Sequence, residues 1–393
     1  MQEKKVKSTK MKKIIFLFLT TTCFINCDEK IAILSTIEVK NTLNMDREFE
    51  TVEIDISNFT ADNYIISKEN SKEKINFQLV DTNSDGKDNV LLFQPKIKAN
   101  STNKYNLSIS TKIQDSVTTY CYSRFVPERT DDYAWENNRV AFRTYGPVAQ
   151  KMVEDGVKGG TLSSGIDAWL KRVEYPIINK WYKETTEDKG TYHEDTGEGL
   201  DNFHVGVSRG VGGIAIKTDT TYQYSKNFTD YKTITNGPIR TSFVLNYEAW
   251  DANGKQIEES KHISLDYGQN LSRFEIHISE TDTISAGLTL HKKDGITSQD
   301  KNWISYWEPF DDSELGQGLV ANDAYFMSSK KYVTSKKDES NFYANLRVVN
   351  NKVIYYAGFG WKKSNQFKTQ QEWESYLRDF AIKIKNPFLV TQN

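Results

Sequence analysis

The sequence contains very little cysteine, which excludes a scaffold held together by disulfides. Of its three cysteines, Cys23 and Cys27 lie in an N-terminal leader, so only Cys121 is left for the body of the chain. A single cysteine cannot form an intramolecular disulfide. Cys121 lies in the alternating stretch Thr-Thr-Tyr-Cys-Tyr-Ser, where a small buried thiol is expected rather than a catalytic thiolate.

The chain also lacks an excess of positive charge, which argues against nucleic-acid binding. Its 51 Lys and Arg residues are offset by 53 Asp and Glu residues, and the formal net charge is −2. Basic patches with interleaved aromatic residues, typical of nucleic-acid-binding proteins, do not occur. The motifs of nucleotide-binding proteins, serine hydrolases and His-Glu-x-x-His metalloproteases are absent as well, so we expect no cofactor and no catalytic metal.

Long apolar runs are missing too. The apolar run Ile14–Leu19 is far shorter than the roughly 20 residues of a membrane helix. It follows Lys12 and Lys13 and precedes Cys27, which is the order of a secretory signal. We predict a lipoprotein-type signal peptide over residues 1–26, with residues 1–10 as an extension ahead of the true start, and lipidation at Cys27. The protein would be exported and held at the cell envelope by the lipid alone; simple secretion is the alternative.

The dominant period of the remaining chain is two, which predicts a mainly β protein. Short alternating segments separated by turn residues predict an N-terminal β-sandwich over residues 27–125. Val126-Pro127 marks the boundary to a second region, 126–393, which is also mainly β. Helical or irregular patches are expected only near residues 161–182 and 370–384.

One turn of the N-terminal region has spaced oxygen ligands. Asp81, Asn83 and Asp85 precede Gly86, as in a calcium-binding loop, but the twelfth position is Leu92 instead of glutamate. A hairpin turn rich in Asp, Asn and Gly is therefore favoured over a structural calcium site.

Three expected strands of the second region carry charge on one face and apolar residues on the other. Because side chains alternate along a strand, the charged faces can be read directly. They comprise Arg139, Arg143 and Tyr145; Arg240, Asn246 and Glu248; and Arg273, Glu275 and His277. Plain solvent exposure explains any one of them. Together with 21 Tyr and 8 Trp, they favour a polar groove for an acidic saccharide, because arginine binds carboxylate or sulfate with two N–H groups.

The segment from Tyr192 to Gly213 is the strongest candidate for chemistry. It combines two histidines, four carboxylates and one arginine with six glycines, a composition that favours a site-forming loop over scaffold. Among the five histidines, His193 is favoured for a direct role and His277 comes second. His204 is expected to pack or bond locally, and His262 and His291, which lie beside lysines, are expected to be solvated.

Several motifs in order resemble a family of exported proteins that carry an uncharacterised domain and occur in polysaccharide-degrading bacteria. The motifs fall at residues 126–136, 164–169, 175–182, 193–201 and 208–210. The resemblance covers most of the mature chain. It implies a galactose-mutarotase-like β-supersandwich over 126–393, and a dehydratase that acts on sulfated ulvan-type oligosaccharides and forms a 4,5-unsaturated uronic acid at the non-reducing end.

Such a reaction needs a base, an acid for the leaving oxygen and positive charge at the carboxylate. His193 or Tyr182 is the expected base, with the other or Tyr192 as the acid, and Glu194 would orient His193. Arg209 with Arg143 or Arg240 would neutralise the carboxylate. The other expected substrate-binding residues are Arg139, Trp181, His277, Glu198 and Asp201.

Other functions fit parts of the same pattern. A glycoside hydrolase would use two of the clustered carboxylates, and a polysaccharide lyase would cleave acidic glycans. A non-catalytic glycan-binding lipoprotein would use the same aromatic residues and arginines. The crowding of titratable groups over residues 192–209 favours an enzyme, because binding alone needs fewer proton donors and acceptors.

Overall fold

A computed structural model describes residue 1 and residues 32–393, except 60, 62, 72 and 111–116. Residues 2–26 of the predicted signal peptide and Cys27 lie outside these described residues. The described chain is mainly β, and this confirms the fold class expected from the period of two. No helix in this part of the chain is both long and apolar enough to cross a membrane.

The N-terminal unit is a sandwich of two small antiparallel sheets. One sheet has the strand order β28-β1-β7-β3-β4, and the other has the order β2-β6-β5. Alternate residues such as Ile37, Leu91 and Leu107 fill the space between them. The strands are β1 (Ile33–Lys40), β2 (Val52–Asp55), β3 (Tyr64–Lys68), β4 (Lys74–Ile75), β5 (Phe77–Val80), β6 (Val90–Phe93), β7 (Thr102–Ile109) and β28 (Leu389–Gln392).

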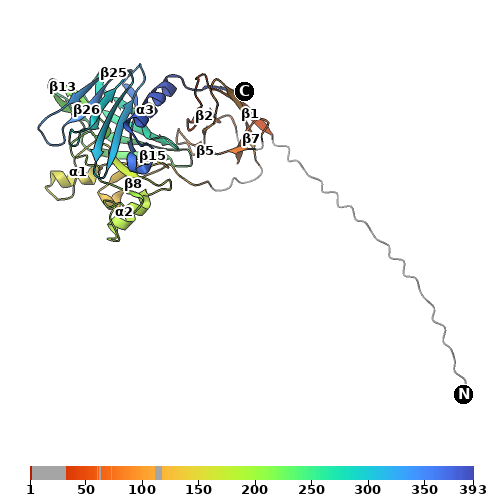
Figure 1. Cartoon of the computed structure of the whole chain (residues 1–393), viewed down its shortest axis with the longest axis horizontal. Coiled ribbons are helices and arrows are strands. Elements are labelled where there is room, and N and C mark those ends of the chain that lie inside the picture. Colours follow the sequence, from red (N-terminus) through yellow and green to blue (C-terminus); the bar gives the residue numbers. More distant parts are fainter. Residues whose placement is uncertain (2–31, 60, 62, 72, 111–116) are drawn as a thin grey trace.

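The boundaries of this unit differ from the expected 27–125 and 126–393 at both ends. The last strand, β28, returns to pair antiparallel with β1, with Val390 opposite Val39, so the C-terminus lies beside the first strand (Figure 1). Strand β8 (Tyr122–Val126) instead pairs with β9 (Asp132–Glu136) of the second unit. The sequence pattern cannot reveal such long-range pairing, because strands of either unit alternate in the same way.

The second unit is a supersandwich built on one eight-stranded antiparallel sheet with the order β15-β16-β19-β20-β27-β24-β23-β22. Two five-stranded sheets, β12-β11-β10-β9-β8 and β14-β13-β21-β26-β25, share its inner apolar core. The remaining strands are β10 (Ala141–Thr144), β11 (Asp167–Lys171), β12 (Gly199–Leu200), β13 (Val211–Thr218), β14 (Thr221–Gln223), β15 (Phe228–Thr235), β16 (Arg240–Tyr247), β17 (Trp250–Asp251), β18 (Gln256–Ile257), β19 (Glu259–Asp266), β20 (Leu271–Ile278), β21 (Thr283–Thr289), β22 (Ile296–Gln299), β23 (Trp303–Phe310), β24 (Ser313–Val320), β25 (Phe326–Tyr332), β26 (Asn341–Arg347) and β27 (Lys352–Trp361).

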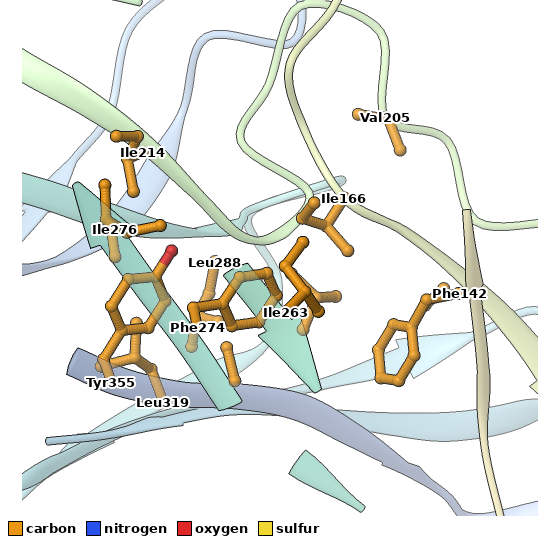
Figure 2. Close-up of a cluster of buried hydrophobic side chains, with 14 of the residues drawn as sticks. Phe142, Ile166, Val205, Ile214, Ile263, Phe274, Ile276, Leu288, Leu319 and Tyr355 are labelled. Carbon is orange, nitrogen blue, oxygen red and sulfur yellow. The ribbon is translucent and has the colours of Figure 1, made fainter. Parts of the chain in front are cut away.

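The core between these sheets is aliphatic and aromatic. Figure 2 shows Phe142 of β10, Ile263 of β19, Phe274 of β20 and Leu288 of β21 converging in it, although they come from three different sheets. All four side chains are fully buried. The core therefore fixes the position of β10, which carries part of the site described below.

The described residues include three α-helices that lie outside the sheets, α1 (Pro147–Glu154), α2 (Ile178–Thr186) and α3 (Gln370–Lys385), and two short 3-10 helices, Pro127–Arg129 and Lys362–Ser364. The expected helix near 370–384 corresponds to α3, whose first turn is capped because the Thr369 side chain accepts a hydrogen bond from the Glu372 N–H. The stretch 161–182, expected to be helical or irregular, is irregular over residues 161–165 and helical from Ile178, where α2 begins, but between these parts it contains β11.

The acidic turn at Asp81 is a hairpin turn between β5 and β6. The Asp81 carboxylate accepts hydrogen bonds from the backbone N–H groups of Ser84 (2.6 Å) and Gly86 (2.8 Å), and the Asn83 amide bonds Asp85. The backbone thus uses the oxygens that a calcium ion would need. Calcium binding stays the less favoured alternative for this turn.

Helix α3 is fixed to the large sheet by Trp373, which is fully buried. The indole fits against three glycines, and a Cβ at Gly316, Gly318 or Gly360 would approach its ring to within 2.9 Å. Trp373→Ala should lower the free energy of unfolding by about 3–5 kcal/mol, because it leaves a large cavity in a tight contact. Urea denaturation followed by circular dichroism measures this, with exposed Ser375→Ala as control. A loss below about 1 kcal/mol would contradict this packing role.

Candidate functional site

Two adjoining hollows form one groove on the second unit. Their volumes are about 650 and 360 Å³, and they share Asn202, His204 and Asp338. The larger hollow also contains His193, Arg143 and Tyr145. We call the whole feature the histidine groove, because three of the five histidines, His193, His204 and His291, line it.

The segment 192–210 forms one wall of this groove, and a short strand fixes it in place. Strand β12 pairs with β11, and the Asp201 N–H donates to the Tyr192 carbonyl at 2.7 Å. Gly199 has φ 114°, and a Cβ there would lie 1.9 Å from the Leu170 carbonyl oxygen, so only glycine fits. The expected site-forming loop is thus a rigidly docked segment.

Most charged groups of this segment are used in fixing it. Asp195 accepts from Arg172 (2.9 Å) and from the N–H of Gly197, and its pKa is lowered by these bonds despite partial burial. Glu198 accepts from Tyr175, Lys180 and Trp181, and these bonds likewise lower its pKa.

His193 keeps one ring nitrogen free for chemistry. Its Nδ1 lies 2.6 Å from the Asp201 carbonyl oxygen, which can only accept, so the neutral ring carries its proton on Nδ1. The side chain is 59% exposed. Nε2 is therefore left with a lone pair at the groove, as a general base requires.

Beneath His193, the Arg143 guanidinium lies in a buried ring of carboxylates. Its Nη2 lies 2.6 Å from Asp167 Oδ2 and 2.7 Å from Asp201 Oδ2, and its Nη1 lies 3.6 Å from Asp132 Oδ2. Strand register explains the arrangement, because Arg143 of β10 is directly opposite Asp167 of β11. Tyr192 adds its hydroxyl, which accepts from Arg129 (3.2 Å) and Arg143 (3.4 Å).

Burial dominates the electrostatics of this cluster. It raises the pKa of Asp132 to about 6 and that of Asp167 to about 7, although Arg143 opposes both shifts. Burial also raises the pKa of Asp201. Tyr145 lines the groove and donates to Asp167 Oδ2 at 3.3 Å, and burial raises its pKa well above the usual value. Tyr145 is therefore a protonated donor that contacts a carboxyl group able to exchange protons near neutral pH.

The other histidines correct the expectations for them. His204 is 61% exposed and pairs with Asp338 at 2.9 Å across the groove, so it does not pack locally. His291 is mostly buried, with Nδ1 2.6 Å from Glu308 Oε1, and is not solvated. His262 is partly buried and bonds Ser242 at 2.7 Å, and burial lowers its pKa.

The rim of the smaller hollow is basic. Lys292, Lys293, Lys336 and Lys337 are all exposed there, against Asp311 and Asp338. Within the described residues, no group of three or more His, Cys, Asp or Glu side chains is arranged to hold a metal ion. The groove thus offers acid-base groups and lysine ammonium groups.

Two residues expected to act in catalysis are buried away from the groove. Arg209 is fully buried, where it donates to Ser164 Oγ and to the carbonyls of Ile214 and Val207 and lies over Tyr224. It cannot neutralise a substrate. Tyr182 is also fully buried and donates to Asp132 at 3.1 Å, and burial raises its pKa, so it is not the base.

Four further expectations fail for the same physical reason, that partners within the fold occupy the polar groups. Arg139 donates to Asn270 at 2.6 Å, Trp181 is buried and donates to Glu198, and Arg240 pairs with Asp266 and Glu53. Glu198 is 8% exposed. Of the others, Glu194 is exposed, and the Asp201 carbonyl rather than Glu194 orients His193. His277 lies on β20 beside Glu275, outside the groove.

Sequence reasoning missed Asp132, Asp167, His291 and Asp338 as site residues. It placed Tyr145 on the charged strand face with Arg143 but gave it no role in acid-base chemistry. Asp167 stands in the family motif 164–169. The pairing of His291 with Glu308 and of His204 with Asp338 has no sequence signal, because each joins distant segments.

The whole body of the chain matches one known family, described as a domain of unknown function, DUF4861, over residues 39–390. The chain belongs to this family. A relative from Formosa agariphila, named "Uncharacterized protein P7", is 55% identical over 393 residues, which cover 97% of this chain and 100% of the relative. These matches confirm the expected resemblance to an uncharacterised-domain family, and they assign no activity.

Two solved structures from Enterococcus faecalis are similar at 9% identity and TM-score 0.49. One is described as a protein in glycosyl hydrolase family 38, and the other as an alpha-mannosidase. They align with 93% and 91% of this DUF4861 protein. The chain spans only 48% and 46% of their lengths.

The raised pKa of Asp132 predicts a pH-dependent stability. Because its folded-state pKa of about 6 exceeds the ordinary 3.8, the folded protein binds more protons between these values, and Asp132 contributes less stability as pH rises through them. We subtract the unfolding free energy of Asp132→Asn from that of wild type. This difference should fall by up to about 3 kcal/mol between pH 4 and pH 7. Urea denaturation at each pH measures it. A difference that stays constant or rises would contradict the assignment.

Proposed function

We propose that the histidine groove is the active site of a carbohydrate-active dehydratase. It would remove water from the uronic acid at the non-reducing end of an acidic oligosaccharide, sulfated or not and of the ulvan type, to give a 4,5-unsaturated uronate. The observation that carries the proposal is the pairing, in one hollow, of an exposed His193 with a free Nε2 and a protonated Tyr145.

The proposed reaction uses these two groups in turn. His193 Nε2 takes the C5 proton, and the electron pair of that bond forms the C4–C5 double bond as the C4–O bond breaks. Tyr145 protonates the departing 4-oxygen, which leaves as water. Asp167 then returns a proton to Tyr145 through their hydrogen bond, since its pKa of about 7 permits exchange at neutral pH. His193 releases the C5 proton to solvent and Asp167 takes up one proton from solvent, so all three groups return to their starting states. Asp201 and Arg143 are positioning residues, because Asp201 holds His193 and Arg143 holds Asp201.

Charge on the groove supports an acidic substrate. The four exposed lysines of the rim outnumber its two aspartates and would attract a carboxylate or sulfate group. A neutral glycan would gain nothing from this excess. The predicted lipid anchor would place the enzyme at the cell envelope, where extracellular polysaccharides are met.

The direct test is incubation of the mature protein with saturated oligosaccharides that end in a uronic acid. Ultraviolet absorbance should rise while mass spectrometry records the loss of one water without chain cleavage. Cleavage with rising absorbance would assign a polysaccharide lyase, and cleavage without it a glycoside hydrolase. Binding without any reaction would assign a glycan-binding protein. Each of these three outcomes overturns the dehydratase.

The role of His193 predicts a large kinetic effect. His193→Gln should lower kcat by about 10²–10⁴-fold, because a general base contributes that much, with little change in KM. His277→Gln is the matched control, since His277 is similarly exposed but lies outside the groove. Equal rates for the two variants would remove His193 from the mechanism.

The role of Tyr145 predicts an equally specific effect. Tyr145→Phe keeps the packing of the ring but removes the hydroxyl that protonates the leaving oxygen, so kcat should fall by about 10²-fold or more. Steady-state kinetics measures this. A substrate with a better leaving group at C4 should recover part of the rate only if Tyr145 is the acid, and recovery in His193→Gln instead would reverse the two roles.

A further inference from the structure

A second cavity lies where three parts of the protein meet. Its volume is about 440 Å³, and its walls come from the N-terminal sandwich, the outer face of the eight-stranded sheet and helix α3. Phe49, Arg240, Arg273, Tyr356 and Phe380 are among its lining residues. We call this cavity the interdomain cleft. Among the described residues, none lines both the interdomain cleft and the histidine groove. Domain interfaces and volumes of this order are typical of small-molecule sites.

The floor of the cleft carries part of the charged sheet face that the sequence reveals. Arg240 makes a two-point pair with Asp266 (2.6 and 2.8 Å) and reaches across to Glu53 of the sandwich at 2.6 Å. Arg273 pairs with Glu275 at 2.6 Å. Each guanidinium is therefore held in one orientation before a ligand arrives, and its charge is balanced.

One wall of the cleft is aromatic. Tyr356 of β27 packs edge-on against Phe380 of α3, with ring centroids 4.9 Å apart, and Tyr376 follows at 6.0 Å from Phe380. All three are only partly buried. The cleft thus presents an apolar aromatic wall beside an array of fixed hydrogen-bonding groups.

This combination suits a neutral saccharide. Four acidic side chains (Glu50, Glu53, Asp266 and Asp379) line the cleft against three basic ones, and the arginines already pair with carboxylates, so a phosphate or sulfate gains no net attraction. Sugar hydroxyls both donate and accept, and sugar C–H faces pack on aromatic rings.

Peptide recognition by strand addition does not fit the floor of the cleft. The strands that form this floor, β16, β19, β20 and β27, are all interior strands of the sheet, and each has a hydrogen-bonded neighbour on both sides. A bound peptide would find no free backbone edge on the floor. A ligand that lies on the floor is therefore recognised by side chains.

We propose that the interdomain cleft is a second, non-catalytic binding site for a neutral saccharide unit. It does not depend on the proposed dehydratase, because it shares no lining residue with the groove. Its effect would be to hold a glycan chain at a point away from the acidic end on which the groove acts.

Isothermal titration calorimetry of the full chain with cellobiose, xylobiose, maltose and mannobiose tests the proposal. At least one disaccharide should bind with a stoichiometry of one. Arg273→Gln and Tyr356→Phe should each weaken that binding by about tenfold, the effect of losing one hydrogen bond to a charged or fixed group. Arg347→Gln is the matched control, since this exposed arginine of β26 lines neither cavity.

Four outcomes would overturn the inference. The first is that none of the four disaccharides binds. The second is that binding is unchanged in both cleft variants although their urea unfolding curves match wild type. The third is that inorganic sulfate and glucuronic acid bind the cleft more tightly than any neutral sugar. Loss of binding in His193→Gln would also overturn it, because the saccharide would then occupy the groove. The dehydration assay is separate, so failure of one proposal leaves the other standing.

Discussion

The interaction on which the site depends is the buried Arg143 guanidinium with its three aspartates. It joins β9, β10 and β11 to the segment 192–210, because Asp132, Asp167 and Asp201 come from three different parts of the chain. Burying so many charges is costly unless each is paired. The cost appears in the raised pKa values of Asp132 and Asp167, where desolvation outweighs the attraction of the guanidinium.

The same cluster determines which residues of the groove can react. Asp201 binds Arg143 through its side chain and His193 through its carbonyl, so a buried ion pair positions an exposed imidazole. Tyr145 donates to Asp167 Oδ2, which also accepts from Arg143. Charge buried at the base of the groove thus provides rigidity, and the groups at its surface provide the acid-base chemistry.

The second unit contributes to two ligand-sized cavities that differ in the charge of their lining residues. The histidine groove has a lysine rim, whereas the charges of the interdomain cleft cancel within the protein. The cleft exists only because β28 and α3 bring the C-terminal chain back to the N-terminal sandwich. A protein arranged in this way can hold an acidic chain end and a neutral sugar unit at separate places.

The sequence alone determines the local features of this protein. The period of two predicts its mainly β character and the strand face that carries Arg240 and Arg273, because strand alternation is a local property. It also predicts that the chain forms two β units. Residues 192–213 are rich in glycine and titratable side chains, and this composition also predicts the segment that forms the wall of the groove. His193 could be chosen from this composition, because its neighbourhood is polar and rich in glycine.

Only the tertiary structure decides which polar groups are free and which are already paired. Arg209 and Tyr182 look reactive in the sequence but are buried with internal partners, while Tyr145 and Asp167 become a pair through the register of β10 and β11. The pairing of β28 with β1 is likewise decided only by the tertiary structure. Burial and pairing depend on contacts between residues far apart in the chain, and neither periodicity nor composition specifies such contacts.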